Sequence, residues 1–65
     1  MRDKISEIKS LTSALTSAGV DREDIATAIK KHHIVNGKAS ANFNSVKSIE
    51  VADNILKELL VLKGE

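Results

Sequence analysis

The stretch VKSIEVADNILKELLVLK, residues 46–63, is the longest segment of the chain with a regular hydrophobic period. At about 100° per residue, its apolar side chains fall on one side of a helix and most of its charged side chains on the other. The apolar arc covers about half of the circumference, which is wider than the stripe of an ordinary surface helix, so this helix needs packing partners on two sides. Its members are Val46, Ile49, Val51, Ala52, Ile55, Leu56, Leu59, Leu60 and Leu62.

Capping residues place the limits of this helix at residues 45–63. Asn44 and Ser45 are both favourable N-caps, and Gly64 stands where a left-handed C-terminal cap is common. Lys63, in the last turn, carries the charge that suits the helix dipole. We therefore expect the third and longest helix of the chain here.

Two shorter helices are expected before it, over residues 3–18 and 21–35. Asp3 and Asp21 are the predicted N-caps, and Gly19 ends the first helix. Asn36-Gly37 is a strong turn or C-cap signal, and residues 36–44 form a polar loop in which Phe43 is expected to cover one end of the core. The expected fold is therefore an all-α domain of three helices, with residues 1–65 as a single unit.

Length and composition narrow the possible classes of protein. The chain has 65 residues with no cysteine or proline, and Phe43 is its only aromatic residue. It therefore has neither a disulfide nor a thiolate metal site to add to a small core. No apolar run is long enough for a membrane span, and the N-terminus lacks the apolar core of a signal peptide. We expect a cytoplasmic protein.

Self-association is a second way to stabilise a small core. The run Leu59-Leu60-Val61-Leu62 surrounds the third helix near its end, which is more apolar surface than two flanking helices readily cover. We therefore expect a homodimer packed through the third helix. The residues predicted to form this dimer or partner interface are Ile55, Leu59, Leu60, Val61 and Leu62.

The charge distribution suggests a second contact surface. No acidic residue lies between Ile25 and Ile49, whereas this span holds four lysines and two histidines, in a chain of formal net charge +1. Such a basic region can contact phosphates or an acidic protein surface, although a solvated helix end is the plainer interpretation. The predicted partner or nucleic-acid contacts are Lys30, Lys31, His33, Lys38 and Lys47.

A helix-turn-helix is one interpretation of residues 11–30, with Gly19 in the turn. Leu15 is large for the close approach of two helices, and the acidic residues that follow Gly19 would face phosphates. In a variant of this interpretation the second helix is the support and the helix from Asn44 reads DNA, with Ser45, Lys47 and Ser48 at the contact and Lys38 on the DNA backbone. Both remain open from the sequence.

Catalysis is not expected. His32 and His33 are adjacent, so their side chains diverge by about 100° on a helix and do not suit one metal ion. The chain has no glycine-rich phosphate loop and little material for a closed pocket. We expect a small non-enzymatic regulatory or adaptor protein that binds another protein, without a cofactor or a small-molecule substrate. The alternatives are a dimeric helix-turn-helix-like DNA-binding regulator using residues 30–47 and a structural assembly subunit.

Overall fold

Three helices, a short β-hairpin and a 3₁₀ turn make up residues 2–64, the part of the chain that the computed structural model describes. In chain order they are α1 (Arg2–Ser17), α2 (Arg22–His32), β1 (Ile34–Val35), β2 (Lys38–Ala39), η1 (Phe43–Ser45) and α3 (Ile49–Lys63). Of the expected all-α fold, the three helices and the mostly helical class are confirmed, but the chain also contains a short hairpin that was not expected. None of these helices is long and apolar enough to cross a membrane.

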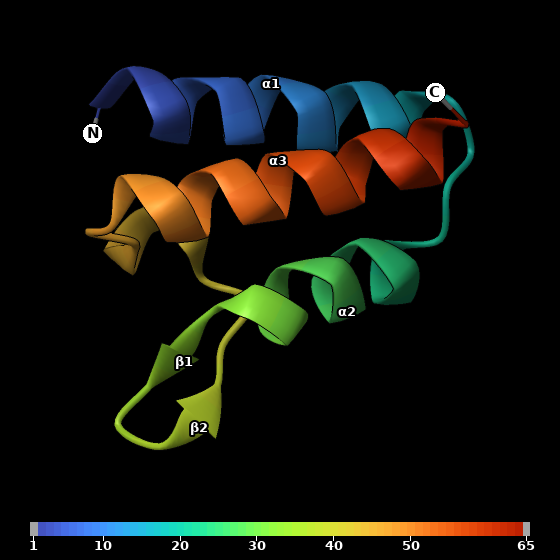
Figure 1. Cartoon of the computed structure of the whole chain (residues 1–65). Coiled ribbons are helices and arrows are strands. Elements are labelled where there is room, and N and C mark those ends of the chain that lie inside the picture. The colour runs from blue at the N-terminus through green and yellow to red at the C-terminus, as the bar shows by residue number, and fades with distance from the viewer. Residues whose placement is uncertain (1, 65) are drawn as a thin grey trace.

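α3 lies between α1 and α2 and packs against both (Figure 1). α1 and α3 run in the same direction, and α2 runs the opposite way. The wide apolar arc of α3 therefore has the two flanking partners that its pattern predicts. The buried core draws on all three helices and on the segment before α3; its members are Ile8, Leu15, Ile25, Ala28, Ile29, Val46, Ala52, Ile55 and Leu59.

α1 and α2 contact each other much less than each contacts α3. Phe43 of η1 packs against the core, and it lines a depression between α1 and α2 together with Ala41. The prediction that Phe43 covers part of the core is confirmed. Because α3 and Phe43 occupy the space between them, α1 and α2 do not form the close pair that a helix-turn-helix over residues 11–30 requires.

α3 ends as predicted but begins later. Gly64 adopts the left-handed conformation (φ 89°) and donates its N–H to the carbonyls of Leu60 and Val61. The N-cap is Ser48 rather than Asn44 or Ser45. The predicted start fails because residues 43–45 form their own turn, which Asn42 caps by accepting a hydrogen bond from the Asn44 N–H at 3.2 Å.

The predicted end of the second helix is also wrong, because α2 stops at His32 rather than near residue 35. Asn36 and Gly37 both have positive φ, 52° and 77°, as a two-residue hairpin turn demands. Asn-Gly therefore joins two antiparallel strands instead of ending a helix. The β-branched pair Ile34 and Val35, which suits a strand better than a helix end, becomes β1.

The connection between α1 and α2 follows the sequence signals closely. Gly19 takes a positive φ of 90°, and the N–H of Val20 bonds back to the carbonyl of Leu15 at 3.0 Å. Asp21 caps α2 by accepting a hydrogen bond from the Glu23 N–H at 2.9 Å. Asp3, in contrast, lies inside the first turn of α1 rather than before it, so its predicted role as N-cap is wrong.

Candidate protein-binding surface

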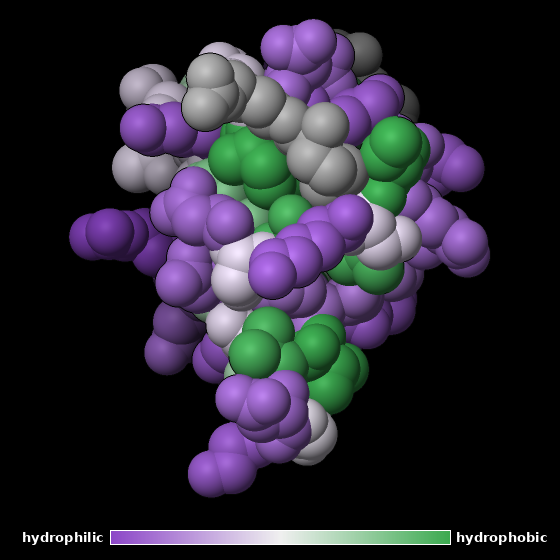
Figure 2. Space-filling view, turned by 90° about the vertical axis from the view of Figure 1, so that its left-hand side faces the viewer, coloured by the Kyte–Doolittle hydropathy of each residue, from purple (hydrophilic) through white to green (hydrophobic). Residues whose placement is uncertain are grey.

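A groove runs between the hairpin and the segment that leads into α3; we call it the hairpin groove. One wall comes from β1 and its neighbours, and the other from the chain before α3 and from the first turns of that helix. Its lining residues are His33, Ile34, Val35, Asn36, Ser45, Val46, Lys47, Ser48 and Val51. Figure 2 shows this end of the molecule, where hydrophobic side chains reach the surface among hydrophilic ones.

Large apolar side chains are unusually exposed at this end. Ile34 is 60% exposed and Ile49 is 57% exposed, while Val35 and Val51 are half-buried. Ile34 lies on the hairpin, and Ile49 is the first residue of α3. Single exposed apolar residues are common on protein surfaces, but several around one groove mark a candidate interaction site.

His33 is buried, 5% exposed, and is not available as a contact residue. Its Nδ1 lies 3.2 Å from the Ser40 carbonyl oxygen, and because a carbonyl only accepts, Nδ1 carries the proton. Its Nε2 lies 3.4 Å from the Ser45 hydroxyl, which also reaches the Asn42 carbonyl at 2.9 Å. The predicted surface role of His33 is therefore wrong. Its side chain leaves α2 at the C-cap and holds the hairpin against η1.

Lys31, whose side chain is 63% exposed, and the half-buried His32 both reach Glu58 of α3. The Glu58 carboxylate accepts from His32 Nε2 at 3.2 Å and lies 3.3 Å from Lys31 Nζ. The hydrogen bond from His32, followed by that from Lys31, lowers the pKa of Glu58 below its ordinary value. This cluster links the end of α2 to α3. Lys31, one of the four lysines predicted to contact a partner, is therefore already in an ion pair.

Lys30, Lys38 and Lys47 remain exposed and form no ion pair with any residue that the structure describes. They come from the end of α2, from β2 and from the segment before α3. Lys47 lines the hairpin groove itself. Four of the five residues predicted as partner contacts are thus exposed, and all of these but Lys31 are without an ion pair in the described part of the chain.

The other predicted surface, at the end of α3, is smaller than expected. Ile55 and Leu59 are fully buried between the helices and have no surface to offer a partner. Leu62 packs against the core and is partly buried. Leu60 is 39% exposed and Val61 is 67% exposed. We call Leu60, Val61 and Leu62 the C-terminal patch.

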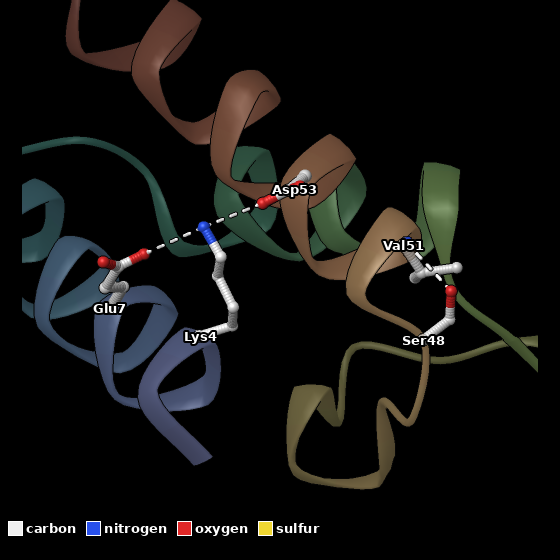
Figure 3. A network of polar contacts seen from close by, with 5 residues as sticks. All are labelled: Lys4, Glu7, Ser48, Val51 and Asp53. Atoms are coloured by element: carbon white, nitrogen blue, oxygen red, sulfur yellow. Dashed lines mark hydrogen bonds and ion pairs between the residues drawn. The ribbon is translucent and has the colours of Figure 1, made fainter. Parts of the chain in front are cut away.

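A shallow groove between α1 and α3 adjoins this patch; it is lined by Leu11, Leu56 and Leu60 and by the polar residues Ser6, Glu7 and Ser10 of α1. Nearer the start of both helices, Lys4 bridges them (Figure 3): its Nζ lies 3.0 Å from Asp53 and 3.7 Å from Glu7. The hydrogen bond with Asp53 raises the pKa of Lys4. The α1–α3 seam is thus apolar at one end and closed by an ion pair at the other.

No family model matches this sequence, and no curated protein or solved structure is significantly similar to it. Within residues 2–64, no three His, Cys, Asp or Glu side chains are grouped as a metal site would require. The proposed function therefore rests on the fold and its surfaces alone. They define a small three-helix domain with one apolar, lysine-flanked groove at the hairpin end and one smaller apolar patch at the opposite end of α3.

Proposed function

We propose that the protein is a small non-enzymatic adaptor or regulator that acts by binding another protein through the hairpin groove. The observation that carries this proposal is exposed Ile34 in the lining of the groove, together with exposed Ile49, which follows the lining residue Ser48 at the start of α3. Burying a large aliphatic side chain contributes about 1.5–3 kcal/mol when it goes from full exposure to full burial. Two such side chains, already more than half exposed, can serve as anchors for a partner.

The roles of the two histidines support a non-catalytic function. His33 donates a hydrogen bond to the Ser40 carbonyl and its Nε2 lies 3.4 Å from the Ser45 hydroxyl, and His32 is bonded to Glu58. Both side chains therefore serve packing between elements. The hairpin groove is open to solvent along its length, which favours a polypeptide over a small substrate that needs to be surrounded.

The test is affinity capture from cell extract, after nuclease treatment, with the immobilised full chain. Ile34→Asp should abolish capture of the specific partner. Val61→Asp is the matched control, since Val61 is at least as exposed, 67% against 60%, and lies at the other end of α3. Circular dichroism should show that both variants remain folded. Loss of the partner with Val61→Asp but not with Ile34→Asp would move the function to the C-terminal patch.

We also propose that the chain forms a homodimer through the C-terminal patch and the adjoining α1–α3 groove. Exposed Leu60 beside the half-buried Leu11 and Leu56 supports this arrangement. Ile55 and Leu59 are no longer part of the proposed interface, because the monomer buries them. Light scattering of the wild type and of Leu60→Asp tests it: the dimer predicts a mass that halves in the variant, and a wild-type monomer at micromolar concentration would end it.

DNA binding is the second candidate function, because Lys30, Lys38 and Lys47 are exposed and without ion pairs. A mobility shift that weakens steeply with salt and is lost when all three are changed to Glu would support it. The near-neutral formal charge of +1 argues for a protein partner instead. A structural assembly subunit, the third class, predicts particles much larger than a dimer in the same light-scattering measurement.

A further inference from the structure

We infer that the hairpin groove binds an extended, acidic segment of the partner protein, which adds as a third strand to the free edge of β1. This inference rests on the proposed function and specifies the chemistry of its partner. Strand addition gains affinity from main-chain hydrogen bonds and specificity from pockets for alternate side chains. The hairpin groove supplies a free strand edge for main-chain hydrogen bonds and apolar surface for side chains, and Lys47 lines it as well.

The free edge follows from the register of the hairpin. β1 pairs with β2 alone in the described chain, with Ile34 opposite Ala39. Ser40 donates its N–H to the carbonyl of His33 at 3.0 Å, so these two residues form a hydrogen-bonded pair. Such pairs alternate with non-hydrogen-bonded ones along an antiparallel ladder. The N–H and C=O of Ile34 therefore point away from β2, toward the edge where a further strand would lie.

The walls of the groove suit an extended chain. Residues of β1 line it and residues of β2 do not, so the groove lies on the β1 side of the hairpin. Val46 and Val51 contribute apolar surface to the opposite wall. Successive side chains of a strand point to opposite faces, so every second side chain of an added strand can contact these apolar residues while the others reach toward solvent.

Charge selects an acidic occupant. Lys47 lines the groove and has no ion pair in the described part of the chain, and exposed Lys38 lies on the neighbouring strand. No Asp or Glu occurs between Ile25 and Ile49. Two copies meeting edge to edge at β1 would bring the lysines of one hairpin toward those of the other. An acidic segment meets complementary charge instead.

The test is titration of the ¹⁵N-labelled full chain with a blocked synthetic peptide in which aspartate or glutamate alternates with valine. Binding should shift the amide signals of Ile34, Val35, Lys47 and Val51, with little effect at the C-terminal patch. Lys47→Glu should weaken binding about fivefold, the upper range for one exposed ion pair. Lys57→Glu, at an exposed position of α3 outside the groove, is the matched control and should bind as the wild type does.

Two further probes separate strand addition from other contacts. The same peptide with alternate main-chain nitrogens methylated keeps its side chains but loses the strand hydrogen bonds, and it should no longer bind. A peptide with lysine in place of the acidic residues should bind more weakly than the acidic one.

The inference is overturned if the methylated peptide binds as tightly as the unmodified one, or if Lys47→Glu has no effect. It is also overturned if a short DNA duplex shifts the groove signals while the acidic peptide does not, or if the groove signals shift with protein concentration alone. If the peptide fails while Ile34→Asp still loses the captured partner, the proposed function stands and only the acidic-strand inference falls. If both fail, both are wrong.

Discussion

Replacing Leu59 with alanine should remove much of the stability of the domain. Leu59 is fully buried between the three helices, and a buried Leu→Ala substitution costs about 3 kcal/mol, within a range of about 2–5 kcal/mol. A domain of 65 residues has a total unfolding free energy of about 3–10 kcal/mol. At about 4–8 °C per kcal/mol for a chain of this size, the melting temperature should fall by about 12–24 °C.

Leu60→Ala is the matched control, because it makes the same chemical change one residue along α3 on a side chain that is 39% exposed. It should cost about 1 kcal/mol or less in the monomer, at protein concentrations too low for the proposed dimer, since the truncated side chain leaves no enclosed cavity there. Guanidinium unfolding followed by circular dichroism measures both. Equal costs for the two variants would refute the placement of Leu59 in the core. A cost at Leu59 that shrinks as the protein is diluted would refute it in favour of an interface.

Three other substitutions test local features. Glu58→Gln removes a carboxylate whose pKa is lowered by His32 and Lys31. Because the pKa of Glu58 is depressed in the folded state, the carboxylate stabilises the fold at pH values above its ordinary pKa of 4.5. This stabilisation is lost as the pH falls through the folded-state pKa. The difference in unfolding midpoint between wild type and Glu58→Gln should therefore shrink at acidic pH, and a constant difference would contradict the pairing. Gly37→Ala places a side chain at a φ of 77° and should cost about 1–2 kcal/mol, with the hairpin amide signals moving most; an unchanged stability would contradict the turn. Asp21→Ala should cost about 1 kcal/mol by loss of the N-cap, measured by thermal unfolding, whereas an effect within error would mean that the cap does not stabilise α2.

The order and number of the helices could be predicted because their signals are local. The hydrophobic period of residues 46–63, the caps Asp21 and Gly64, and Gly19 each act within a few residues of where they stand. The half-circumference apolar arc also indicated that α3 packs on two sides. These features depend on side-chain spacing, which the sequence displays directly.

The hairpin could have been predicted but was not. Asn36-Gly37 is the strongest two-residue hairpin signal, and Ile34 and Val35 before it are β-branched. The same dipeptide also suits the end of a helix, and the helical period of residues 25–32 favoured that interpretation. In each strand only two residues are paired. This is too few to show the alternation that identifies a strand.

The candidate surface depended on contacts that no local pattern contains. His33 and Lys31 are both basic residues near the end of the second predicted helix, yet one is enclosed by Ser40 and Ser45 while the other reaches Glu58. Likewise Leu59 and Leu60 differ only by the 100° rotation between neighbours on a helix, and this decides which is core and which is surface. The rotation of α3 about its own axis, relative to α1 and α2, decides which of its residues are buried and which are exposed.

The most direct test of the central proposal, that the hairpin end is the partner-binding surface, is photo-crosslinking in living cells. A photoreactive phenylalanine analogue replaces Ile34 in one variant and Val61 in the other, and the full chain is recovered after illumination. The proposal predicts a crosslink from position 34 to a protein of discrete size, other than a second copy of this chain, and no such product from position 61. Crosslinks to that protein from position 61 alone, or crosslinks from position 34 only to nucleic acid or to the chain itself, would contradict it.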